Sequence, residues 1–125
     1  LDEDRGAALD NLARNPAAFD FGEVDEQSGR RLEQLARAPE PTMRLLAVRA
    51  LGRSGNLDYV PTLVYALTDP DRRVALEARN GLTFTSRRFS GFGMPENYDE
   101  KQRYEAFDRW KRWYLAIRPD AVFEL

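Results

Sequence analysis

The stretch "DYVPTLVYALTDPDRRVALEARNGL", residues 58–82, decides the fold, because its pattern predicts two amphipathic helices joined by a tight turn. Apolar residues recur at three- and four-residue spacing on both sides of the turn, which is the period of a helix with one buried face. They are Val60, Leu63, Val64 and Leu67 in the first half, and Val74, Ala78 and Leu82 in the second.

Residues that favour helix ends stand at the borders of these two segments. Gly55 suits the end of a preceding helix, and Asp58 suits the N-cap of the next one. In the turn, we expect Asp69 to cap the second helix, Pro70 to take its first position and Asp71 to face its positive end. The stretch therefore predicts a helical hairpin.

The same pattern occurs 31 residues earlier, in "RRLEQLARAPEPTMRLLAVRALGRSG", residues 30–55. The matching positions are apolar, small or turn residues, as a shared backbone requires. The pairs are Leu32 with Leu63, Leu35 with Ala66, Pro39 with Pro70, Met43 with Val74, Ala47 with Ala78, Ala50 with Gly81, and Leu51 with Leu82. The small residues at Ala47, Ala50, Ala78 and Gly81 predict closely packed helices.

This repeat resembles the HEAT-repeat family, in the short bacterial form related to the repeats of phycobilisome bilin lyases. The residues that carry the resemblance are "PTMRLLAVRALGRSG" (41–55) and the stretch 58–82. The resemblance implies an all-α protein, a short right-handed α-solenoid of helical hairpins with two repeats of about 31 residues over 25–86. Ala38 stands where the family pattern has a capping Asp.

We expect one domain over residues 1–125, with the two repeats flanked by further segments. Residues 1–24 are expected to hold an N-terminal helix (3–14) and a connector, and residues 87–125 a capping loop and helix. The predicted cap helix, 99–118, begins at Asp99 and carries an aromatic stripe of Tyr104, Phe107, Trp110, Tyr114 and Ile117. Because an open solenoid leaves its last apolar face wet, we expect Trp110 to be buried there.

The segment "SRRFSGFG", residues 86–93, permits three interpretations. A phosphate-binding loop lacks support, because Gly91-x-Gly93 follows a helix and has no third glycine. Stacking of the phenylalanines on nucleic-acid bases is an alternative. The favoured interpretation is that Phe84, Phe89 and Phe92 cover the second repeat, while Gly91 and Gly93 supply turns.

The amino-acid composition excludes several classes of catalytic and metal site. Among the 125 residues there is no Cys and no His, which excludes thiolate nucleophiles, zinc–thiolate sites and histidine-based catalysis. Acidic residues 20–26 lack the ligand spacing of a calcium loop and indicate a solvated loop. We therefore expect no enzyme activity, cofactor or metal site. No apolar run is long enough to span a bilayer. Cytoplasmic location is favoured, with export after loss of a signal left open because the chain begins at Leu1.

The expected function is a non-catalytic protein–protein interaction module, a subunit or accessory of a larger assembly. Residues 41–95 carry eight arginines against four acidic residues, which favours a partner protein with an acidic surface. The candidate partner-binding residues are Arg44, Arg49, Arg53, Arg72, Arg73, Arg79, Tyr59, Tyr65 and Trp113. Alternatives are nucleic-acid binding through the arginine stripe and, from the resemblance, a bilin-lyase-type subunit.

Overall fold

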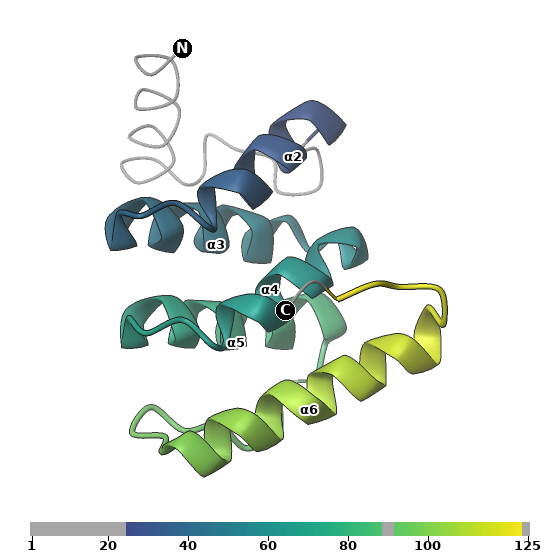
Figure 1. The fold of residues 1–125 in the computed structure, drawn as a ribbon. Helices are drawn as coiled ribbons and strands as arrows, with labels where there is room; N and C mark the ends of the chain where they lie inside the picture. The colour runs from purple at the N-terminus through teal and green to yellow at the C-terminus, as the bar shows by residue number, and fades with distance from the viewer. Residues whose placement is uncertain (1–24, 89–91, 124–125) are drawn as a thin grey trace.

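A computed structural model describes residues 25–88 and 92–123 of the chain, and these residues form helices and loops without a strand (Figure 1). The helices are α2 (Glu26–Leu35), α3 (Pro41–Ser54), the short 3-10 helix η2 (Leu57–Tyr59), α4 (Val60–Ala66), α5 (Arg72–Ser86) and α6 (Glu100–Ile117). The predicted N-terminal helix, its connector, Phe89 and Gly91 lie outside the described residues.

Two helical hairpins stack on one another, with α6 beyond the second. α3 lies alongside α5 in one layer, while α2 and α4 belong to the other, as Figure 1 shows. The fold class predicted from the sequence, an all-α helical solenoid, is confirmed. No helix in the described part of the chain is long and apolar enough to cross a membrane.

α3 and α5 approach most closely at a pair of glycines. A Cβ atom added to Gly52 would lie 2.7 Å from the Cα atom of Gly81, and one added to Gly81 would lie 2.7 Å from the Cα atom of Gly52. Since real Cβ atoms do not come this close to a backbone atom, the packing of the two repeats requires glycine at both positions. The predicted role of Gly81 is confirmed, and Gly52 is its partner.

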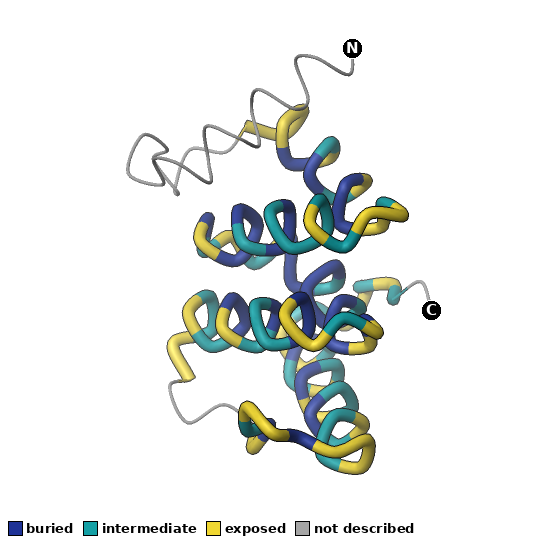
Figure 2. The backbone as a smooth tube through the Cα atoms, turned by 90° about the vertical axis from the view of Figure 1, so that its left-hand side faces the viewer, coloured by how far each residue is buried: buried dark blue, intermediate teal, exposed yellow. Residues whose placement is uncertain are grey.

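The core runs through both hairpins and into the cap (Figure 2). The side chains of Val48 and Leu51 on α3, Leu63 on α4 and Val74 and Leu82 on α5 are fully buried. Removing such side chains from water stabilises a fold by about 1.5–3 kcal/mol each. The apolar pattern of the repeats therefore marks the buried faces as predicted.

The helix ends differ from prediction at two places. Gly55 ends α3 with φ 67°, as expected, but Asn56 rather than Asp58 caps the following 3-10 helix, accepting a hydrogen bond from the backbone N–H of Asp58. At the second hairpin, Asp71 caps α5, accepting from the N–H of Arg73 at 2.9 Å. The expectations that Asp69 caps this helix and that Pro70 takes its first position are wrong, because the carboxylate of Asp69 is bound elsewhere and α5 begins at Arg72.

The capping helix α6 buries Trp110 as predicted. Asp99 begins the helix with reciprocal side-chain and backbone bonds to Gln102, and Trp110 is 1% exposed. Phe92, from the loop, meets the Trp110 ring edge-on at 4.7 Å between centroids. The aromatic cover of the second repeat is thus formed by Phe92 and α6.

Two residues of the predicted aromatic stripe are not buried. Tyr104 is 71% exposed and Ile117 is 48% exposed. At 3.6 residues per turn, Tyr104 points about 120° away from Trp110, and Ile117 is the last residue of α6. The buried stripe consists instead of Ala106, Trp110 and Tyr114, with Phe107 partly buried.

Candidate partner-binding surface

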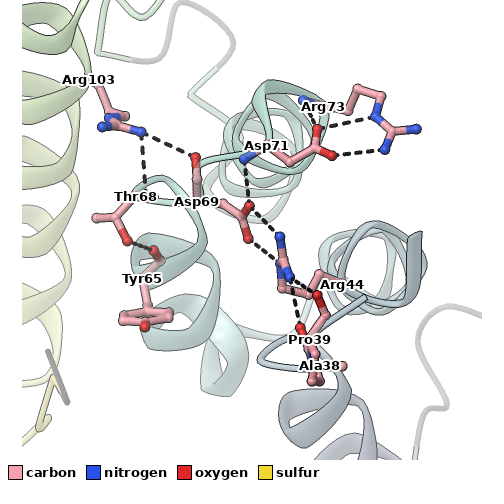
Figure 3. Close-up of polar contacts among 9 residues, drawn as sticks. All are labelled: Ala38, Pro39, Arg44, Tyr65, Thr68, Asp69, Asp71, Arg73 and Arg103. Atoms are coloured by element: carbon pink, nitrogen blue, oxygen red, sulfur yellow. Dashed lines mark hydrogen bonds and ion pairs between the residues drawn. The ribbon is translucent and has the colours of Figure 1, made fainter. Parts of the chain in front are cut away.

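Arg44, a predicted surface residue, joins the two repeats from a largely buried position (Figure 3). Its guanidinium donates to the Asp69 carboxylate at 2.8 and 3.1 Å, and to the carbonyl oxygens of Ala38 and Pro39 at 2.8 and 2.9 Å. With the Arg44 side chain 14% exposed and Asp69 7% exposed, the pair is shielded from water. Arg44 therefore holds the loops of the two hairpins together.

Arg72 and Arg79 fix the loop between α5 and α6. Arg72 donates to the carbonyl oxygens of Glu96 and Tyr98 at 2.9 and 3.0 Å and lies over the Tyr98 ring, 4.0 Å from its centroid. Arg79 donates to the carbonyl oxygen of Met94 at 3.0 Å. Their guanidinium groups are engaged in the fold, which reduces what they can offer a partner.

Arg73 remains at the surface, paired with Asp71. The guanidinium lies 2.8 Å from the carboxylate with 62% of the arginine side chain exposed. The hydrogen bond from Arg73 lowers the pKa of the Asp71 carboxyl below its ordinary value. A charge pair of this exposure contributes little to stability, because water screens it.

Tyr59 and Trp113 lie inward of the positions expected for surface anchors. Tyr59 is 6% exposed, and a Cβ atom added to Gly29 would lie 1.8 Å from its hydroxyl oxygen, so the ring fills the space that Gly29 leaves. Burial raises the pKa of Tyr59. Trp113 is half-buried against Trp110, with 5.6 Å between ring centroids. Neither side chain presents a whole aromatic face to solvent.

A hollow of about 400 Å³ lies over the contact between α3 and α5. Its lining consists of Arg49, Gly52, Arg53, Glu77, Asn80, Gly81 and Phe84. Arg49 donates to Glu77 across the hollow at 2.8 Å. The glycine pair forms part of the lining because it carries no side chains. We call this site the α3–α5 hollow.

Phe84 is the most informative residue of the α3–α5 hollow. The expectation that it covers the second repeat is wrong, because the residue is 56% exposed. It follows Asn80 by four residues and Gly81 by three, which places it on the side of α5 that faces the hollow. The spacing from Gly81 was the sequence signal that could have indicated this position.

Arginines dominate the two helices that form the hollow. Residues 41–54 and 72–88 contain eight arginines and a single acidic residue, Glu77. Arg49 and Arg53 line the hollow, while Arg87 and Arg88 are exposed directly after α5. Because Arg49 is paired with Glu77, the positive charges beside the exposed Phe84 ring are those of Arg53 and Arg87, although the whole chain has a formal net charge of −2.

A second hollow, of about 410 Å³, lies between the end of α4 and the start of α6. It is lined by Tyr65, Thr68, Glu100, Arg103, Tyr104 and Phe107. Arg103 donates to the carbonyl oxygens of Thr68 and Asp69 at 3.5 and 3.2 Å, and the guanidinium of Arg37 lies over the Tyr65 ring at 4.1 Å. The guanidinium of Arg37 therefore covers part of the Tyr65 ring, which lies near Thr68 in Figure 3.

Residues 30–87 match the family model for HEAT repeats. This segment, which spans most of α2 and all of α3, α4 and α5, is therefore similar to HEAT repeats. HEAT repeats commonly act as non-catalytic protein-interaction modules. No curated protein and no solved structure matches the chain. The expected relation to bilin lyases stays a prediction.

Proposed function

We propose that this protein is a non-catalytic interaction module that binds another protein with the outer face of α3 and α5, as a subunit or accessory of a larger assembly. The α3–α5 hollow carries the proposal, because it combines an exposed Phe84 with flanking polar and charged groups. An aromatic side chain in a recess, surrounded by polar residues, is the arrangement from which protein interfaces take most of their binding energy.

The chemistry of the site supports binding rather than catalysis. The chain contains neither His nor Cys, and in residues 25–88 and 92–123 there is no cluster of three or more acidic residues that could hold a metal ion. The groups that line the hollow are arginines, one ion-paired glutamate, an amide and a phenylalanine. Such groups recognise a surface by charge and shape.

The test is affinity capture from the organism that makes the protein, followed by mass spectrometry and binding measurements with the purified candidate. We expect Phe84→Ala to abolish specific capture. Tyr104→Ala is the matched control, since it removes another exposed ring from the second hollow. Failure of the wild-type protein to capture any protein reproducibly would contradict the proposed function.

Nucleic-acid binding is a second candidate, favoured by the concentration of arginines on α3 and α5. Measurements with duplex and single-stranded DNA over a salt series decide it. Binding through phosphates weakens steeply as salt rises, because counterions are released. Absence of binding at low salt excludes this candidate.

A further inference from the structure

We infer that the α3–α5 hollow receives one bulky apolar side chain from an acidic segment of the partner protein. The inference rests on the proposed function and specifies the chemistry of the partner. It has two parts: an apolar anchor that packs on Phe84 above Gly52 and Gly81, and carboxylates that flank this anchor.

The apolar part follows from the shape of the hollow. Gly52 and Gly81 bring the two helix backbones together, so the recess ends on backbone rather than on side chains. Phe84 forms one wall and leaves 56% of its surface open to water. Apolar surface that a partner removes from water stabilises the complex in proportion to its area, which a small polar side chain cannot match. The hollow therefore suits a large aliphatic or aromatic side chain.

The acidic part follows from the charges around the hollow. Arg53 lines it, and Arg87, the C-cap residue of α5, is exposed three residues after Phe84, about one helical turn away. An extended peptide advances about 3.3 Å per residue. Carboxylates that meet these arginines therefore stand within about three residues of the anchor in the partner sequence.

Glu77 favours an acidic protein segment over a nucleic acid. Its carboxylate lines the hollow and is paired with the guanidinium of Arg49 at 2.8 Å. A DNA duplex carries a negative charge about every 1.7 Å along its axis, so its phosphates would compete with this carboxylate for Arg49. A peptide can place a neutral residue opposite Glu77 and keep its charged residues for the arginines on either side.

The test uses the whole protein and a random library of 12-residue peptides displayed on phage. Peptides enriched on the wild-type protein are synthesised with a fluorescent label and measured by anisotropy. We expect them to share one large apolar residue with Asp or Glu within about three positions. Phe84→Ala is expected to weaken their binding about tenfold or more, as removal of a central anchor does.

The charge contribution is tested by Arg53→Glu combined with Arg87→Glu. The matched control is Arg30→Glu combined with Arg112→Glu, which makes the same charge change at exposed sites on α2 and α6. The first pair is expected to slow association about tenfold and to reduce its salt dependence, whereas the control leaves both within about twofold. Circular dichroism checks that each variant is folded. If a double variant does not fold, the inference is tested by Phe84→Ala alone.

Four results would overturn the inference. The enriched peptides could lack acidic residues, bind Phe84→Ala as well as the wild-type protein, or lose binding only with Tyr104→Ala; in each case the interaction function stands. The fourth result is that no peptide binds. If a labelled 20-base-pair DNA duplex then binds and is lost in the Arg53/Arg87 variant, the hollow belongs to a nucleic-acid site; if it does not, affinity capture alone decides the proposed function.

Discussion

Arg44 and Arg73 each pair with an aspartate of the turn before α5, at very different exposure. The Arg44 side chain is 14% exposed beside Asp69, whereas Arg73 is 62% exposed beside Asp71. Removing one partner of a buried pair leaves the other charge uncompensated, while an exposed charge is solvated by water. The two arginines therefore differ in what their loss does to the fold.

We expect Arg44→Met to lower the free energy of unfolding by about 3–5 kcal/mol, since Asp69 is left charged and buried. Arg73→Met is the matched control, and it should change the free energy of unfolding little, because the Arg73 charge is exposed to water. Urea unfolding followed by circular dichroism measures both. Equal changes in the two variants would show that Asp69 is compensated by its remaining bond to the backbone N–H of Asp71.

Asp69 also shows what local sequence could not predict. Asp69 and Asp71 both suit an N-cap, and a choice between them from neighbouring residues favoured Asp69. Asp71 is the N-cap because the carboxylate of Asp69 is bound by Arg44, which lies 25 residues earlier in the sequence. Similarly, the burial of Tyr59 depends on the space left by Gly29, which lies in another helix.

At the scale of helices, the apolar period predicted the two hairpins, because one buried stripe per helix is sufficient to define a repeat. It could not predict the α3–α5 hollow. The position of the hollow depends on where α3 crosses α5, and that crossing is set by Gly52 and Gly81 together. The expectation for Phe84 was wrong for this reason, because its side of α5 becomes the wall of a hollow only where α3 ends beside it.

We expect Gly81→Ala to destabilise the protein by about 1–3 kcal/mol, because the added Cβ atom meets the Cα atom of Gly52. The sign is informative, since alanine favours an isolated helix over glycine by about 1 kcal/mol. The control Asn80→Ala changes an exposed neighbour on α5 and should be neutral or stabilising. A more stable Gly81→Ala protein would contradict the close crossing of the two helices.

At the scale of the whole molecule, α6 covers the apolar face that the second hairpin would otherwise expose to water. It packs along α4, and its Trp110 is 1% exposed. We expect Trp110→Ala to cost about 3–5 kcal/mol, a large part of the stability of a domain of this size. Tyr104→Ala, at a position 71% exposed on the same helix, is the control and should change stability little. Near-equal unfolding free energies for the two variants would contradict the capping role.

The placement of the indole rings makes α6 a built-in optical probe. Both tryptophans of the chain, Trp110 and Trp113, belong to α6, so tryptophan emission reports on this helix alone. Far-ultraviolet circular dichroism sums over all helices. If α6 leaves the repeats before they melt, the emission shifts to the red at a lower temperature than the loss of ellipticity; if the two curves coincide, cap and repeats unfold as one cooperative unit.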